Sequence, residues 1–414
     1  MPNPLSAVFL AAVAVTTALR VWLALRQIDH VRAHRGAVPA EFAERIPLAE
    51  HQKAADYTVA KARIGLAELC AGTALLLAYT FGGLLQALFA FWQRHFDSAG
   101  YAHGIALFAA FGLVGFVVDL PFALYRTFIV EARFGFNRTT WATWLGDLGK
   151  STVLAIVIGT PLLLAVLWLM QAMGERWWLW VWIFWLGFNL LVMLLYPTWI
   201  APLFNKFSPL EDAALQRRIE ALLSRCGFAV SGLFVMDGSK RSSHGNAYFT
   251  GLGRHKRIVF FDTLLARLSG DEIEAVLAHE LGHFRRRHVW KRLAFLAATS
   301  LVLLWMLGRA TGEAWFYAGL GVAGQSDAMA LILFSLVLPV FAFPFAPLGS
   351  ALSRRHEYEA DAYAAGQARA QDLVTALVKL YRDNAATLTP DPVHSRFYDS
   401  HPPAVLRIAR LQTL

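Results

Sequence analysis

Seven long apolar segments constrain the fold of this chain more than any other feature of its sequence. A helix rises about 1.5 Å per residue, so each segment is long enough to cross a hydrocarbon layer about 30 Å thick. Of the 414 residues, 57% are hydrophobic and only 16% are charged. We therefore predict a multi-pass membrane protein whose spans lie at 5–25, 64–92, 104–125, 151–173, 177–200, 292–311 and 328–350.

Positive charge alternates along the connections between these segments. The first, third and fifth connections and the C-terminal segment are rich in Lys and Arg, whereas the second, fourth and sixth connections are nearly free of them. Basic loops remain in the cytoplasm, so we predict an N-terminus outside and a C-terminus inside. Contact of these loops with anionic lipid explains the net charge of +9 without nucleic acid as a partner.

This topology divides the chain into four parts. Residues 1–200 form the first five spans, 201–291 a polar segment, 292–350 the last two spans, and 351–414 a second polar segment. Both polar segments are predicted to lie in the cytoplasm, where they can build one shared site.

Polar residues within the spans leave a second class of function open. Glu68, Asp119 and Asn189 lie in apolar segments, where such groups either pair between helices or face a water-filled cavity. A transporter would carry residues of this kind as well. The two cysteines, Cys70 and Cys226, exclude a disulfide framework and a cysteine-rich zinc module.

The segment 201–291 has the pattern of a small α+β domain. Ser208 and Pro209 predict the start of an amphipathic helix that ends at residue 226. Ser269 and Glu272 form a capping box that opens a later helix. Between the two helices, short apolar runs predict strands at 233–236, 246–250 and 257–261.

The helix after the capping box carries the sequence His279-Glu280-Leu281-Gly282-His283. Histidines four residues apart lie on one helical face, so both imidazoles can reach a single zinc ion at about 2.0–2.1 Å. Zinc lowers the pKa of water, and Glu280 is placed to accept its proton and pass it to a leaving amine. The alternative is a chance pair of histidines, which the intervening glutamate makes much rarer. Gly282 weakens the helix but permits close approach of the metal or another backbone.

A third protein ligand is expected in the run from Ser353 to Asp361. Glu357 and Asp361 are four residues apart and share a face, so one can ligate zinc while the other accepts a hydrogen bond from a ligating histidine. Their spacing alone leaves both assignments open. Glu359 projects elsewhere and is expected to be exposed or ion-paired, and His288 is expected not to ligate.

These residues resemble the type I CAAX prenyl proteases, which are integral-membrane zinc metalloproteases. The similarity extends nearly from end to end, and the combination is more specific than the zinc motif alone. Besides the zinc motif, it rests on Phe134-Gly135-Phe136-Asn137-Arg138-Thr139-Thr140, Tyr196-Pro197, Pro202-Leu203-Phe204-Asn205-Lys206-Phe207, Asp237-Gly238-Ser239-Lys240-Arg241-Ser242, Asn246-Ala247-Tyr248-Phe249, Glu357-Tyr358-Glu359-Ala360-Asp361 and Ser400-His401-Pro402-Pro403 with Arg407.

The resemblance implies a mainly α fold, in which a seven-transmembrane-helix barrel surrounds a large chamber and a cytoplasmic zincin-like α+β domain caps it. It assigns one zinc ion per chain to His279, His283 and Glu357, with Asp361 behind the ligands. Further residues are expected to act on the substrate: His401 would stabilise the tetrahedral intermediate, while Asn246, Ala247 and Arg407 would contact the peptide.

The expected activity is hydrolysis of a peptide or protein substrate that is prenylated or otherwise associated with the lipid bilayer. The composition, rich in Ala, Arg and Leu, favours a bacterial source and therefore the bacterial inner membrane. Two alternatives are a transporter braced by a structural zinc and a protease-like scaffold that binds without cutting. The three candidate ligands with a separate acid, Glu280, favour the peptidase, because a structural zinc has four protein ligands.

Overall fold

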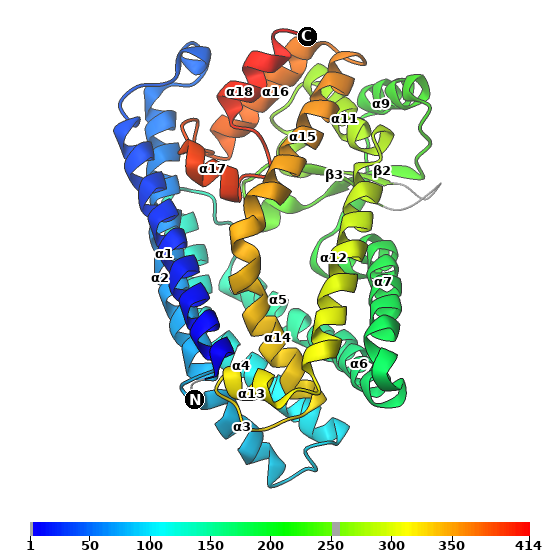
Figure 1. The fold of residues 1–414 in the computed structure, drawn as a ribbon. Coiled ribbons are helices and arrows are strands. Elements are labelled where there is room, and N and C mark those ends of the chain that lie inside the picture. The colour runs from blue at the N-terminus through cyan, green and yellow to red at the C-terminus, as the bar shows by residue number, and fades with distance from the viewer. Residues whose placement is uncertain (1–2, 251–256) are drawn as a thin grey trace.

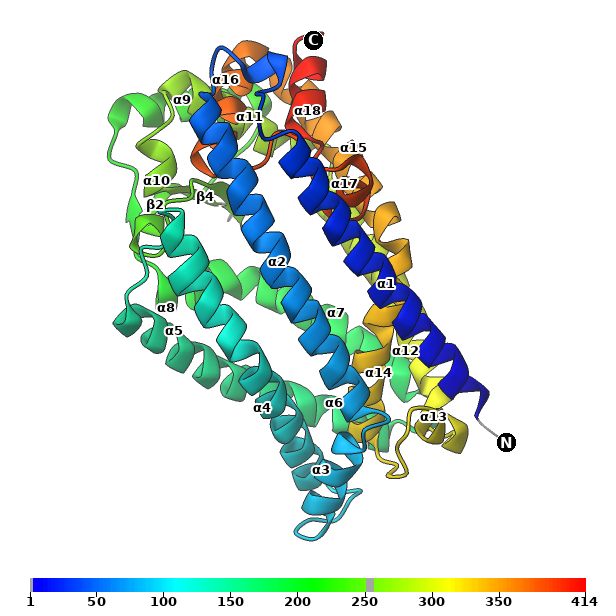
Figure 2. The same cartoon turned by 90° about the vertical axis from the view of Figure 1, so that its left-hand side faces the viewer.

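A computed structural model describes residues 3–250 and 257–414 of the chain. Seven helical spans form a ring, and a smaller domain closes one end of it (Figures 1 and 2). Large apolar side chains are exposed on this ring, such as Trp199 at 73% and Leu348 at 70%, as lipid-facing helices require. The spans are α1 (Pro4–Ala33), α2 (Leu48–Tyr79), α4 with η2 (Tyr101–Glu131), α5 to α6 (Trp141–Ala172), η4 to α8 (Gly174–Phe204), α12 (His288–Ala310) and α14 to α15 (Asp327–Ala365).

Three of these spans contain a π-helical turn. Short π-helical turns lie at η2 (Arg126–Glu131), η3 (Ala155–Gly159) and η5 (Tyr196–Ile200). The turn η2 follows α4 (Tyr101–Tyr125), η3 lies between α5 (Trp141–Leu154) and α6 (Thr160–Ala172), and η5 lies between α7 (Trp177–Leu195) and α8 (Ala201–Phe204). Single-turn 3-10 segments lie at η1 (Ala40–Phe42), η4 (Gly174–Arg176), η6 (Gly238–Lys240) and η7 (Phe343–Phe345).

The prediction of one continuous second span at 64–92 is wrong. The helix α2 begins earlier, at Leu48, and ends at Tyr79, and a separate helix α3 (Leu84–Gln93) follows. Gly83 has a positive φ of 75°, and a side chain at Gly82 would meet the backbone of Ala78 at 2.7 Å. Two adjacent glycines thus allow a tight break that the apolar character of the run conceals.

The smaller domain contains a four-stranded sheet with the order β1-β2-β4-β3. The strands β2 and β4 are parallel, whereas β1 and β3 run antiparallel to their neighbours. The predicted strands are all present, but the predicted helix start at Ser208 and Pro209 is wrong, because these residues lie in β1. The strands are β1 (Phe207–Pro209), β2 (Gly232–Met236), β3 (Ala247–Thr250) and β4 (Arg257–Phe261).

Helices pack against this sheet and enclose the apolar core of the domain. The helix α9 (Ala213–Cys226) begins at Asp212, whose carboxylate accepts from the N–H groups of Ala214 and Leu215 at 2.9 and 3.0 Å. The helix α11 (Gly270–Arg285) begins with the predicted capping box of Ser269 and Glu272. The remaining helices of the polar segments are α10 (Asp262–Leu265), α16 (Ala370–Asp383), α17 (Pro392–Tyr398) and α18 (Ala404–Leu411), and the short helix α13 (Ala314–Gly319) lies between the last two spans.

Arg241 joins the domain to the membrane helices. Its guanidinium donates to the Asp147 carboxylate of α5 at 2.7 and 2.8 Å, to the carbonyl of Phe204 at 2.6 Å and to the side chain of Asn205 at 2.8 Å. Its own carbonyl accepts from the N–H of Arg138 in the third connection. Through its side chain and its backbone carbonyl, Arg241 therefore links three of the motif stretches named above, at 134–140, 202–207 and 237–242.

The last span leads directly into the site. The helix α14 (Asp327–Ala342), the 3-10 turn η7 and the helix α15 (Ala346–Ala365) are continuous, and α15 crosses α11 at close range. A methyl group at Gly282 of α11 would lie 2.9 Å from the Ala360 Cα and 3.0 Å from its carbonyl oxygen. The glycine therefore allows close approach of another backbone, one of the two explanations proposed from the sequence.

We expect the substitution Gly282→Ala to destabilise the protein by about 1–3 kcal/mol through overpacking, despite a gain in helix propensity of about 1 kcal/mol. The added methyl group forces α11 and α15 apart, so metal content should fall together with thermal stability in detergent. Gly349→Ala is a matched control, because Gly349 lies in α15 with no atom within 4 Å of its added Cβ. Equal metal content and stability in the two variants would contradict this account.

Candidate metal centre

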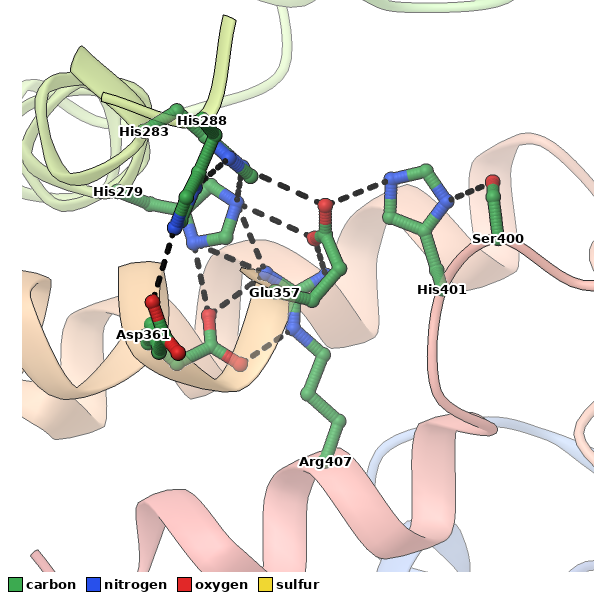
Figure 3. Close-up of polar contacts among 9 residues, drawn as sticks. His279, His283, His288, Glu357, Asp361, Ser400, His401 and Arg407 are labelled. Carbon is green, nitrogen blue, oxygen red and sulfur yellow. Dashed lines mark hydrogen bonds and ion pairs between the residues drawn. The ribbon is translucent and has the colours of Figure 1, made fainter. Parts of the chain in front are cut away.

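Two crossing helices bring the predicted ligands together. His279 and His283 lie on α11, and Glu357 lies on α15 (Figure 3). Their ligand atoms all lie within 4.8 Å of one another, and the three residues are the one such group found in residues 3–250 and 257–414. Glu357 is buried, with 3% of its side chain exposed. The structure thus brings together residues that are more than seventy positions apart in the chain.

The distances between the donor atoms fit a tetrahedral metal site. The two imidazole Nε2 atoms are 3.2 Å apart, His279 Nε2 lies 3.4 Å from Glu357 Oε2, and His283 Nε2 lies 3.3 Å from Glu357 Oε1. Ligands at about 2.0–2.1 Å from a tetrahedral zinc are about 3.3–3.4 Å apart. Glu357 Oε2 is buried without a hydrogen bond, which is costly for a carboxylate unless a cation is present.

Asp361 lies behind His279, on the side away from Glu357. Its Oδ1 is 2.8 Å from His279 Nδ1, and a carboxylate can only accept, so the Nδ1 atom carries the proton. The lone pair of Nε2 is then free to bind a metal. This geometry distinguishes the two acids that spacing left open: Glu357 faces both Nε2 atoms, whereas Asp361 orients one ring.

Arg407 from α18 holds Asp361 in place. Its Nε and Nη2 atoms each donate to the Asp361 carboxylate at 2.7 Å, and its Nη1 lies 3.7 Å from Glu357 Oε2 (Figure 3). Arg407 is buried, with 5% of its surface exposed. These contacts place it behind the ligands, and the predicted contact with substrate stays a prediction.

The charges around His279 compete with its burial. Burial and the neighbouring Arg407 lower the pKa of His279, but hydrogen bonding to the Asp361 and Glu357 carboxylates outweighs them and raises the pKa above its ordinary value. In the protonated imidazolium, the proton on Nε2 must leave before a metal binds there, whereas the proton on Nδ1 stays. The carboxylates of Asp361 and Glu357 therefore favour a positive charge at His279, whether it is a proton or a metal ion.

His288 is the partner of the second ligating histidine. Its Nδ1 lies 2.9 Å from His283 Nδ1, and its Nε2 lies 3.0 Å from the Glu359 carboxylate. Because Glu359 accepts the Nε2 proton, His288 Nδ1 is an acceptor and His283 Nδ1 is the donor. His283 Nε2 then faces Glu357 with a free lone pair, as His279 Nε2 does.

Sequence reasoning missed this contact. His288 was expected not to ligate and Glu359 to be exposed or ion-paired, and Glu359 does pair with His288, with Arg355 at 3.1 Å and with Lys291 at 3.6 Å. The link to His283 depends on Arg287, whose φ of 56° turns the chain between α11 and α12. No sequence pattern predicts a left-handed backbone conformation at an arginine. The one available signal is the presence of three histidines, His279, His283 and His288, near the end of one helix.

The open side of the centre carries His401. Its Nε2 lies 3.5 Å from Glu357 Oε1, its Nδ1 lies 3.0 Å from the Ser400 hydroxyl, and 60% of its side chain is exposed (Figure 3). Glu280, which follows His279 on α11, is half-buried. Both residues are therefore near the cluster without being enclosed among its ligands.

Asn246 and Ala247 lie at the border of the sheet. Ala247 begins β3, which pairs with β4 alone among the described strands. Asn246 precedes it and accepts from the Phe261 N–H through its carbonyl at 3.0 Å. The structure thus places both residues at an edge strand, as the resemblance implied.

Polar residues of the spans have different environments. Glu68 forms an ion pair with Arg126 and lines a cavity between α1, α2 and α14. Asn189 donates to the carbonyl of Trp185 on its own helix at 2.7 Å, and Asp119 is exposed. The pairing and cavity explanations offered from the sequence thus both hold for Glu68.

A ring of seven apolar helices, closed by an H-E-x-x-H helix that meets a buried glutamate, defines an integral-membrane zinc metalloprotease. The N-terminal domain of CAAX prenyl proteases, with five membrane helices, matches residues 27–206, and peptidase family M48 matches residues 209–414. The chain belongs to this family of membrane metallopeptidases.

Individual relatives agree with that assignment. The CAAX prenyl protease 1 homolog of Arabidopsis thaliana is 40% identical over 70% of this chain and 69% of its own length. The homolog of Caenorhabditis elegans is 31% identical over 98% of both chains. The crystal structure of Ste24p from S. mikatae superposes with a TM-score of 0.92 at 31% identity and covers 99% of this chain and 100% of that one.

We expect His288→Ala to weaken zinc binding by about tenfold to a hundredfold, the range observed when a residue supporting a metal ligand is lost. His283 would lose the acceptor that keeps its proton on Nδ1. Competition with a chromophoric zinc chelator measures the affinity directly, independently of turnover. His95→Ala, at the far end of the membrane region, serves as the control. An unchanged zinc affinity in His288→Ala would show that His288 does not orient His283 for metal binding.

Proposed function

We propose that His279, His283 and Glu357 hold one zinc ion in this protease and that Glu280 is its general base. The convergence of three donor groups at tetrahedral spacing carries the proposal. When bound, zinc supplies a Lewis acid that lowers the pKa of water and polarises a carbonyl group. A structural zinc would use four protein ligands, and three donors meet in the described part of the chain.

Glu280 handles the proton in this scheme. It follows His279 directly on α11 and is half-buried, which supports a place beside the ligands and within reach of water. It accepts a proton from the attacking water and donates it to the amine of the departing product. His401, exposed beside Glu357, donates from Nε2 to the oxyanion that develops on the scissile carbonyl.

Asp361 and Arg407 act through other residues. Asp361 fixes the tautomer and orientation of His279, and Arg407 fixes Asp361 with two hydrogen bonds of 2.7 Å. We therefore favour a positioning role for Arg407 over a contact with substrate.

The edge strand β3 provides the substrate-binding surface. An extended peptide that pairs at Asn246 and Ala247, along the edge of β3 that no described strand covers, would be added to the sheet as a further strand. Main-chain hydrogen bonds hold such a peptide largely independently of its side chains. Specificity must then come from contacts with the side chains and the chain end of the peptide.

The substrate class follows from the family. The curated relatives carry the name CAAX prenyl protease, and we propose that this chain cuts peptides near the C-terminus of prenylated or membrane-associated proteins. We further propose the bacterial inner membrane as its location, from the composition rich in Ala, Arg and Leu. The basic odd-numbered connections favour a cytoplasmic site.

The proposal predicts that Glu280→Gln retains zinc and loses peptide hydrolysis. Glutamine has the same shape but cannot accept the proton, and loss of a general base typically costs about a hundredfold to ten-thousandfold in rate. Purified enzyme would be incubated with farnesylated and unmodified peptides, with and without a zinc chelator, and the products identified by mass spectrometry. Full activity in this variant would eliminate Glu280 as the base.

The cytoplasmic orientation has its own test. Single cysteines at Arg138 in the third connection and at Asp97 in the second, in a chain whose Cys70 and Cys226 are replaced by serine, should label from opposite sides. With an impermeant maleimide on intact cells, we expect labelling at position 97 and none at position 138 until the cells are opened. The reverse pattern would place the site outside.

A further inference from the structure

A cavity of about 520 Å³ lies beside His401 and has no part in the hydrolytic scheme above. Its wall is formed by α2 and by the C-terminal segment between α16 and α18. Because His401 lines both this cavity and the open side of the metal centre, a peptide bound at the centre can extend into it. The polar lining residues are Gln27, Thr58, Lys61, Tyr381, Thr387, His394, Tyr398, Asp399, Ser400 and His401.

Lys61 of α2 is one of the residues that line this wall. Its Nζ lies 4.0 Å from the centre of the Tyr57 ring, a cation–π contact that holds the charge without using its N–H donors. The nearby Glu131 carboxylate attracts this ammonium electrostatically, but its direct contacts are with other groups, since it accepts from the Tyr57 hydroxyl at 2.5 Å and lies 3.7 Å from His244 Nε2. Within the described part of the chain, Lys61 forms no ion pair.

We infer that Lys61 binds the free C-terminal carboxylate of the substrate. The inference rests on the proposed function, because a peptidase that cuts near the chain end brings that carboxylate close to its metal centre. An ammonium with unused donors forms strong, charge-assisted hydrogen bonds to a carboxylate. A cation at a fixed place also sets how many residues separate the cleaved bond from the chain end.

The other charged group in the wall supports one orientation of the peptide. Asp399 lines the same cavity as Lys61, and its carboxylate repels a second carboxylate. The end of a substrate chain is therefore favoured near Lys61 and disfavoured near Asp399. The two charges of the wall thus favour one orientation of the bound peptide, with its C-terminal carboxylate toward Lys61.

Two peptides that differ only at the chain end test this site. One is a farnesylated peptide in which three residues follow the modified cysteine and the C-terminus is a free acid. The other is the same peptide with a C-terminal amide. The purified full-length enzyme, Lys61→Ala, Lys61→Arg and the control Arg63→Ala are compared by kcat/KM on both. Arg63 lies on α2 but lines a separate cavity with Arg133.

The readout is the ratio of kcat/KM for the acid to kcat/KM for the amide, which is independent of the folded fraction of each preparation. We expect a ratio of about ten to a hundred for the unaltered enzyme and Arg63→Ala, as for a hydrogen bond to a charged group. Lys61→Ala should reduce it to about one, and Lys61→Arg should retain most of it.

A ratio near one in the unaltered enzyme, or an unchanged ratio in Lys61→Ala, would overturn the carboxylate site and leave the peptidase intact. Cleavage of neither peptide by the unaltered enzyme would instead refute the proposed substrate class, and the inference with it.

Discussion

The close approach of α11 and α15 is the contact on which the metal centre depends. Two ligands come from one helix and one from the other, so the distance between the helix backbones fixes the distance between the donor atoms. Gly282 permits that distance, because its Cα faces the Ala360 backbone without a side chain between them. A residue that weakens its own helix therefore makes the site possible.

Around this crossing, the ligating histidines are oriented from behind in two similar ways. His279 donates to Asp361, and His283 donates to His288, which in turn donates to Glu359. Both arrangements end in a carboxylate and leave a free Nε2 lone pair on the metal side. The first is enclosed and reinforced by the buried Arg407, whereas the second ends at a partly exposed acid that also pairs with Arg355 and Lys291. The two ligands are thus held by supports of unequal rigidity.

Sequence patterns predicted the parts of this structure that depend on local periodicity or on short motifs. The number of spans, the strands, the capping box at Ser269 and the convergence of His279 and His283 with the acidic run that holds Glu357 and Asp361 all follow from such signals. Features that depend on single backbone conformations did not follow. The break of α2 before Gly83 and the left-handed Arg287 each redirect the chain within a run whose composition is unchanged, so hydropathy and spacing cannot reveal them. The choice between Glu357 and Asp361 likewise needed the three-dimensional position of each histidine nitrogen.

The position of the centre at the end of a membrane span has a mechanical consequence. Glu357 and Asp361 lie on α15, which continues from α14 through a single 3-10 turn, and Arg241 anchors the sheet domain to α5 and to the carbonyl of Phe204. The last span therefore runs into the site without an intervening loop, and Arg241 ties the sheet domain to the membrane helices. A substrate that is anchored in the bilayer approaches a centre whose depth relative to the membrane is set by the helices themselves. Under the proposed function, geometry contributes to the selection of membrane-associated peptides as much as recognition of any side chain does.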